Sequence, residues 1–267
     1  MILEKAKTMT LTSGINIGAE NLEVVILKDE QLLGYSIAPA GWDANVALQK
    51  AFNEAIRQSN IKRGEIEKAG VSATSEVNID LPVVYFSELI CSSRGAVWAF
   101  PSARTVVDIG AENNSVLSCD ADGKLISSTR GSGCAAGTGA FLEEIATLLE
   151  LKVEDLGELS RQSRKQILMS SACVVFAESE VISLVHQGHS KEDIIQAVND
   201  SVTNRTLSLF QVIGIKKDVV FIGGVAKNIG IVDSLNKKLG LEVLVPQEPG
   251  IITAVGAALL TRQISNR

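Results

Sequence analysis

The chain has 267 residues, 46% of them hydrophobic, and a net charge of −6 at pH 7. That is enough apolar material for one large α/β domain or for two smaller lobes. The sequence has no basic run and only 4% aromatic residues, which argues against a nucleic-acid surface, because such surfaces need clustered Lys and Arg or stacking aromatic rings. No signal-peptide hydrophobic region is present at the start, and no apolar run is long enough to span a bilayer. We therefore expect a cytoplasmic protein with neither nucleic-acid nor membrane partners.

The first hundred residues predict a meander followed by mixed α/β structure. After a lead-in over residues 1–13, the pattern up to residue 37 predicts three short strands joined by tight turns. Helical spacing of apolar residues follows Gly41. A buried strand is expected near residues 69–73, and a helix from about Ser87 to Ala99, which Pro101 ends. The two tryptophans, Trp42 and Trp98, are expected to pack in the interior.

The same order of elements then starts again. Residues 15–21 read Ile-Asn-Ile-Gly-Ala-Glu-Asn, and residues 107–113, 92 positions later, read Val-Asp-Ile-Gly-Ala-Glu-Asn. This internal repeat predicts two related lobes, 1–101 and 102–267, which face each other across a cleft and each offer a strand–turn–strand hairpin. The Asp-Ala-Asp-Gly turn at 120–123 matches the second turn of the first meander.

The second lobe is predicted to carry the longer helices. Helices are expected at 141–149, 154–160, 173–186, 232–239 and 253–264, with a long one at 191–212 between a Ser190 cap and a Gly214 stop. A buried strand at 219–222 ends in a glycine pair, and a last strand is expected at 242–245.

Two hairpins and a later Gly-Gly turn suit a nucleotide. Hairpin turns offer backbone N–H groups to phosphates, and paired glycines let the backbone approach an adenosine closely. A purely structural α/β fold is the alternative. The candidate nucleotide-binding residues are Asn16, Gly18, Ala19, Glu20, Gly110, Ala111, Gly137, Thr138, Gly139, Glu178, Gly223, Gly224, Val225, Lys227 and Asn228, and the candidate catalytic residues are Asp108 and Glu112.

Two of the four cysteines stand at predicted helix starts. Cys134 lies in the glycine-rich stretch 131–139, and Cys173 follows Ser-Ser-Ala and precedes a helical run. Helix N-termini leave N–H groups unpaired at the positive end of the helix dipole, which suits a thiolate or a bound anion. Cys91 and Cys119 are expected to be buried apolar residues. The 39-residue spacing between the two helix-start cysteines is too long for a compact zinc knuckle, so zinc is the lesser metal alternative.

The ordered set of hairpins, glycine pair and final Gly-Ala-Ala helix resembles the actin, Hsp70 and sugar kinase superfamily. That resemblance implies a duplicated, ribonuclease H-like α/β fold with two lobes around a nucleotide cleft. The runs at 134–139, 170–180 and 223–228 more closely resemble the iron–sulfur ATPase family of 2-hydroxyacyl-CoA dehydratase activators and benzoyl-CoA reductase ATP-binding subunits. The likeness extends from about residue 13 to 262, and residues 88–111 look most like the smaller ATP-binding reductase subunit.

The family resemblance implies a gated electron-transfer component. Cys134 and Cys173 of two subunits would hold one [4Fe–4S] cluster per dimer, in agreement with the four thiolates that such a cluster takes. Ferredoxin or flavodoxin would supply the electron. ATP, with Mg²⁺, would drive a rotation of the subunits that delivers the electron at low potential to a CoA-thioester reductase or dehydratase component. The resemblance leaves homodimer and heterodimer open.

The first hairpin departs from the family pattern. Asn16 stands in place of Asp, Ala19 of Ser, Glu20 of Thr and Glu23 of Lys. An amide cannot position Mg²⁺ and its waters as a carboxylate does, and added acids repel phosphates. We therefore hypothesise that the chain alone binds nucleotide weakly or hydrolyses it poorly.

Two other functions compete with electron transfer. One is a non-hydrolysing nucleotide-binding or assembly subunit paired with an active ATPase homologue. The other is a small-molecule kinase of the same superfamily, which needs a catalytic base in the cleft and leaves Cys134 and Cys173 unexplained.

Overall fold

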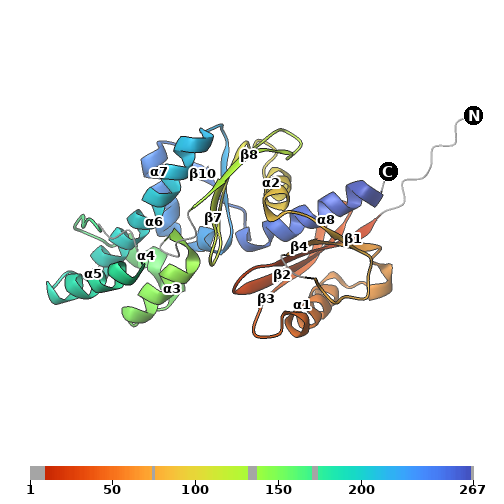
Figure 1. Ribbon diagram of the computed structural model, residues 1–267, viewed down its shortest axis with the longest axis horizontal. Coiled ribbons are helices and arrows are strands. Elements are labelled where there is room, and N and C mark those ends of the chain that lie inside the picture. The colour runs from red at the N-terminus through yellow and green to blue at the C-terminus, as the bar shows by residue number, and fades with distance from the viewer. Residues whose placement is uncertain (1–9, 74–75, 132–136, 170–173, 266–267) are drawn as a thin grey trace, which may run out of the picture. The chain divides into compact units, whose positions relative to one another are not determined.

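The computed structural model describes residues 10–73, 76–131, 137–169 and 174–265. By its internal contacts the chain divides into two compact units, residues 1–95 with 251–267 and residues 96–250. Each unit is built on one five-stranded mixed sheet flanked by helices (Figure 1). This confirms the predicted α/β class.

The sheet of the first unit has the strand order β3-β2-β1-β4-β5. Strands β1, β2 and β3 are antiparallel, whereas β4 and β5 continue from β1 in parallel. The strands are β1 (Leu11–Ile17), β2 (Asn21–Lys28), β3 (Gln31–Pro39), β4 (Lys68–Ser72) and β5 (Val83–Tyr85). The helices are α1 (Ala44–Ser59), η1 (Arg63–Glu65), α2 (Glu88–Ala99), whose end crosses into the second unit, and α8 (Ile252–Ser265).

Helices α1 and α8 cover opposite faces of this sheet. On one face, Ile15 and Val24 pack against Leu48 and Phe52 of α1 in a buried apolar cluster. Helix α8 lies on the other face (Figure 1). There Gly14 is so close to α8 that a side-chain atom on it would overlap a backbone carbonyl of that helix. Successive strand residues point to opposite faces, so one short sheet supports both helices.

The sheet of the second unit has the order β10-β9-β6-β7-β8. Its strands are β6 (Thr105–Ile109), β7 (Asn114–Cys119), β8 (Leu125–Arg130), β9 (Val219–Ile222) and β10 (Val243–Leu244). Its helices are α3 (Gly139–Leu148), η3 (Val153–Asp155), α4 (Leu156–Ser160), α5 (Val174–His186), α6 (Lys191–Ile213), η4 (Gly224–Lys227) and α7 (Ile229–Leu239); η5 (Pro249–Ile251) leads out of the unit.

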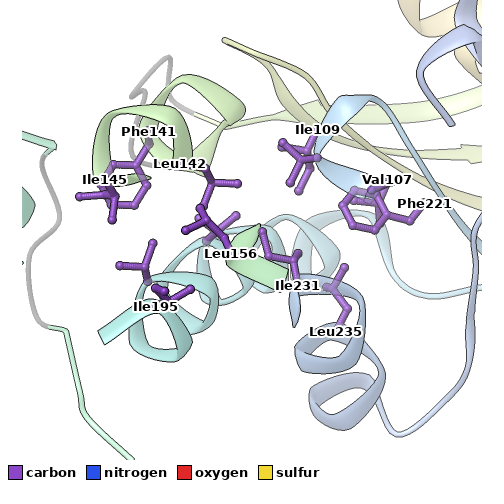
Figure 2. Packing of buried hydrophobic residues seen from close by; sticks show 14 of the residues in the cluster. Val107, Ile109, Phe141, Leu142, Ile145, Leu156, Ile195, Phe221, Ile231 and Leu235 are labelled. Carbon is purple, nitrogen blue, oxygen red and sulfur yellow. The ribbon is translucent and has the colours of Figure 1, made fainter. Parts of the chain in front are cut away.

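The core of the second unit joins the sheet to the five helices α3, α4, α5, α6 and α7. Figure 2 shows Phe141 and Ile145 of α3 on one side of this cluster and Phe221 of β9 on the other. Leu156 of α4 and Ile231 of α7 lie between them. These side chains are almost completely buried. Burial of each large apolar side chain stabilises the fold by about 1.5–3 kcal/mol, which fixes α3 against the sheet.

The two units repeat each other at the level of strand register. Ile17 pairs with Leu22 in the first hairpin, and Ile109 pairs with Asn114 in the second, so every partner is shifted by 92 positions. The two sheets also have the same strand order, which agrees with the internal repeat. The places of β1, β2, β3, β4 and β5 are taken by β6, β7, β8, β9 and β10.

Some details differ from the sequence-based expectations. The first strand begins at Leu11, inside the expected lead-in. The sequence pattern did not indicate this start, because Thr12 and Ser13 are polar. Helix α8 packs in the first unit, whereas the sequence division at residue 101 put it in the second lobe. The expectation that Trp42 packs in the interior is wrong, since its side chain is fully exposed after β3. Within the described ranges, none of the helices combines the length and the apolar character needed to cross a membrane.

Candidate functional site

The first hairpin joins β1 to β2 through a tight turn. The backbone N–H of Gly18 donates to the carbonyl of Asn21 at 2.9 Å. Gly18 and Ala19 are exposed and Glu20 is half-buried, so the turn presents its backbone at the surface of the first unit. One position further from the turn, Asn16 Nδ2 donates to Glu23 Oε2 at 2.8 Å. The two residues that depart from the family pattern at this position therefore bind each other.

The second hairpin, between β6 and β7, has the same geometry. The N–H of Gly110 donates to the carbonyl of Asn113 at 2.9 Å. Asp108 pairs with Ser115 in the ladder and is 7% exposed. Glu112 is exposed in the turn, and Ala111 is half-buried. Hairpin turns of this kind can hold phosphate groups through backbone N–H donors.

The start of helix α3 is bound to the second hairpin turn. The N–H of Gly139 donates to the carbonyl of Gly110 at 2.8 Å, and that of Ala140 donates to the carbonyl of Ala111 at 2.9 Å. A Cβ at Gly139 would lie only 3.2 Å from Ala111 Cα, so a glycine permits this close approach. Thr138, at the N-cap position of α3, is buried. The predicted residues at 110–111 and 137–139 thus form one continuous feature of the second unit.

The glycine pair after β9 adjoins the same hairpin. Gly223 has φ +87°, and a Cβ on it would lie 2.9 Å from Asp108 Oδ1. Both the positive φ and the close approach require glycine here. Val225 in the following η4 turn contacts Gly139, since its Cγ2 lies 3.4 Å from the Cβ position of that glycine. The structure therefore brings the glycine pair, the second hairpin and the start of α3 together.

Two of the predicted adenosine-side residues have structural contacts of their own. Lys227 Nζ forms an ion pair with Glu248 Oε1 at 2.6 Å. The Asn228 side chain caps α7 by accepting from the N–H groups of Gly230, at 3.0 Å, and Ile231, at 3.3 Å. Capping satisfies backbone donors at the helix start. These contacts hold the Gly224–Asn228 turn in place behind the glycine pair.

Asn114 was not anticipated as a site residue, yet it holds both flanks of the first cysteine segment. Its backbone carbonyl accepts from the N–H of Gly131 at 2.8 Å, and its side-chain Nδ2 donates to the carbonyl of Gly137 at 3.0 Å. The same Nδ2 donates to Thr206 Oγ1 of α6 at 3.0 Å. Sequence offered no signal for this role beyond a polar residue that follows the repeated turn.

Cys134 and Cys173 lie outside the described residues, and only their flanks can be placed. Gly131 and Gly137 bracket the segment of Cys134, and α5 begins at Val174, directly after Cys173. A helix start immediately after a cysteine favours its thiolate form. Among the described residues, no group of three or more His, Cys, Asp or Glu side chains could hold a metal ion.

The other two cysteines belong to the core, as expected. Burial, with a smaller contribution from Glu88, raises the pKa of the Cys91 thiol to about 12. Burial also raises the pKa of Cys119, whose Sγ donates to the carbonyl of Ala103. Metal ligation requires the thiolate, so Cys91 and Cys119 are poor ligands.

Glu178 lies on α5 against α3. Its carboxyl hydrogen-bonds the carboxyl of Glu144, and this contact raises the pKa of Glu144. The pair links the helix that follows Cys134 to the helix that follows Cys173.

The sequence pattern of the BadF/BadG/BcrA/BcrD ATPase family matches residues 14–261. The chain belongs to this family. It is 35% identical over 248 residues to the 2-hydroxyisocaproyl-CoA dehydratase activator of Clostridioides difficile, with 93% of each chain covered. It is 30% identical over 263 residues to one of the benzoyl-CoA reductase subunits of Thauera aromatica, with 94% of this chain and 93% of that protein covered.

Solved structures of this ATPase family agree in fold. Component A of the Acidaminococcus fermentans (R)-2-hydroxyglutaryl-CoA dehydratase superposes with a TM-score of 0.91 at 34% identity, covering 97% of this chain and 100% of that one. The Clostridium difficile activator with bound ADPNP has a TM-score of 0.90 at 34% identity, covering 96% of each. A Streptomyces griseus ROK family glucokinase, with a TM-score of 0.60 at 16% identity, covers 95% of this chain and 99% of its own and shares the fold alone. The resemblances to the dehydratase activators and benzoyl-CoA reductase subunits, and to the sugar-kinase fold, are confirmed.

Proposed function

We propose that the chain is the ATP-dependent electron-transfer component of a system that reduces or dehydrates a CoA thioester. Two chains together hold one [4Fe–4S] cluster through Cys134 and Cys173. ATP or ADP, with Mg²⁺, binds at the hairpin turns, and ferredoxin or flavodoxin supplies the electron. Support comes from the family match over residues 14–261 and from relatives named as dehydratase activators and as part of a reductase. The bound ADPNP of one related structure supports the nucleotide.

Each group of residues has a definite task in this proposal. The turns that follow Gly18 and Gly110 offer N–H groups to the phosphates, while the N–H groups of these two glycines close the hairpins. Asp108 offers a carboxylate oxygen to the hydrated Mg²⁺. Gly223 admits a close approach by the adenosine. Cys173, directly before α5, presents its thiolate at a helix N-terminus, and Cys134 supplies the second thiolate from the glycine-rich segment. A [4Fe–4S] group bound there would supply one-electron chemistry at low potential.

One observation carries the proposal furthest. The first turn of α3 is bound to the second hairpin through Gly139–Gly110 and Ala140–Ala111 hydrogen bonds. In the proposal, a change in the hairpin on nucleotide exchange acts on the first turn of α3, which follows the segment of Cys134 in the chain. Packed elements with two discrete arrangements are the usual physical means of such coupling.

A second candidate is a nucleotide-binding or assembly subunit that does not hydrolyse ATP. It is favoured by Ala19 and Glu20, which replace hydroxyl residues in the first turn. A kinase function has less support, because it leaves both helix-start cysteines without a task.

Titration of the anaerobic protein with ATP, with hydrolysis assayed in parallel, distinguishes the candidates. The proposal predicts saturable Mg²⁺-dependent binding together with hydrolysis, and ATP-dependent electron transfer to a dehydratase or reductase component. Binding without hydrolysis in the presence of an intact homologue supports the second candidate. Absence of nucleotide binding contradicts both.

A further inference from the structure

The two hairpins carry one carboxylate each at the same position of the ladder, but on opposite strands. In the second hairpin, Asp108 of β6 pairs with Ser115 of β7. In the first hairpin, Asn16 of β1 pairs with Glu23 of β2, and both residues are 92 positions before their counterparts. The acid stands on the first strand of one hairpin and on the second strand of the other.

Glu23 has the burial and the orientation of a site residue. It is 8% exposed, close to the 7% of Asp108, and it lies one position from the turn, as Asp108 does. Residues directly opposite in an antiparallel pair point to the same face, with Cβ atoms about 4.5–5.5 Å apart. The side chain of Glu is one methylene longer than that of Asp. The carboxylate of Glu23 on β2 can therefore reach closer to the place that an Asp carboxylate on β1 would occupy.

Asn16 holds this carboxylate in place. Its Nδ2 donates to Glu23 Oε2 at 2.8 Å. An aspartate at position 16 would instead put a second carboxylate at hydrogen-bond distance, and two such groups cannot both ionise readily. The amide on β1 and the acid on β2 are therefore a matched pair, and the loss of an acid at position 16 does not leave the hairpin without one.

The geometry points to Glu23 as the carboxylate that the first hairpin offers to the Mg²⁺ of a bound nucleotide, with Asn16 as its positioning residue. This inference rests on the proposed function. Mg²⁺ on a nucleotide keeps several waters and is held by one or two carboxylates together with the phosphates. An ionised carboxylate accepts several hydrogen bonds, so the bond from Asn16 is compatible with contacts to those waters. The inference replaces the hypothesis that the first hairpin has lost its carboxylate function.

The test measures the dissociation constant of ADPNP by calorimetry, with and without Mg²⁺, for the full chain and its variants. Glu23→Gln removes the charge, keeps the shape and keeps an oxygen that can accept from Asn16. We expect it to lose roughly 10- to 100-fold of the Mg²⁺-dependent gain in affinity, the usual effect of losing a group that positions a metal's ligands. Asn16→Asp/Glu23→Gln moves the carboxylate to β1 and should restore most of that gain. Glu67→Gln, at an exposed position beside the far end of β1, is the matched control and should leave the gain unchanged.

Each result decides the question. Loss in Glu23→Gln with recovery in the double variant supports the assignment. An unchanged Mg²⁺ gain in Glu23→Gln overturns it, as does a loss without recovery in the double variant, which would give Glu23 a structural role only. If the unaltered chain binds no ADPNP at all, the proposed function fails as well. The failure of the assignment is thus distinct from the failure of the function.

Discussion

Replacing Asn114 by alanine tests the link between the second hairpin and the cysteine segment. The variant removes the two hydrogen bonds of Nδ2, to the carbonyl of Gly137 and to Thr206 Oγ1. Each bond contributes about 0.5–1.5 kcal/mol net, and a buried carbonyl left unsatisfied costs about 1–3 kcal/mol more. Gly137 is buried, so we expect local opening at the start of α3 to become easier by about 2–4 kcal/mol.

Amide hydrogen exchange followed by NMR measures this local opening directly. The amides of Gly139 and Ala140 donate to the second hairpin, and in Asn114→Ala they should exchange roughly thirtyfold to a thousandfold faster, since about 1.4 kcal/mol is a factor of ten. The amide of Gly131 donates to the backbone carbonyl of residue 114, which the variant retains, so its exchange should change little. Asn113→Ala, at the exposed neighbouring position, is the matched control.

Two results would refute the reasoning. Exchange of Gly139 and Ala140 within about threefold of the unaltered chain would mean that Asn114 does not hold this end of the segment. Equal acceleration of Gly131 and Gly139 would mean that the variant loosens the whole unit rather than one flank.

Three other features of the molecule give predictions of their own. Gly14→Ala should lower the melting temperature, because overpacking against α8 costs about 1–3 kcal/mol or more; an unchanged melting temperature contradicts this packing. Cys91 should resist alkylation in the folded protein at pH 8, because burial raises its pKa to about 12, and should react after unfolding; rapid modification of the folded protein would be the contrary result. Asp193→Asn should reduce stability at pH 7. The N–H of Lys165, with that of Arg164, holds the Asp193 pKa well below its usual range, so its stabilisation is present above the unfolded pKa of about 3.9 and lost as the pH falls below it. Identical stability of the Asn variant and the parent at pH 7 would contradict this account, and the difference between them should vanish in acid.

Local patterns predicted the parts of the fold that depend on local chemistry. The two hairpins were predictable because alternating apolar residues flank turns of the same composition, and the repeat fixes the shift of 92 positions in both. The Ser190 cap and the Gly214 end of α6 were predictable for the same reason, since caps act within one turn of the helix.

Contacts between distant segments could not be predicted in this way. Helix α8 packs on a sheet made of residues far earlier in the chain, through small residues whose type does not identify a distant partner. β5 has only three residues and follows an irregular stretch. The hydrogen bond between Asn16 and Glu23 joins two strands, and it follows from the ladder register rather than from either residue's type. The prediction for Trp42 was wrong because it rested on residue type alone, which suggested burial, whereas the side chain is exposed.

The most direct test of the central claim is iron and acid-labile sulfide analysis of the anaerobically purified chain, together with Cys134→Ser and Cys173→Ser. A four-thiolate cluster shared by two chains requires about two irons and two sulfides per chain. We predict that content in the unaltered protein, with a dimer in solution, and its loss in either serine variant. An iron-free protein after anaerobic reconstitution, or iron that stays bound in both serine variants, would contradict the assignment of these cysteines.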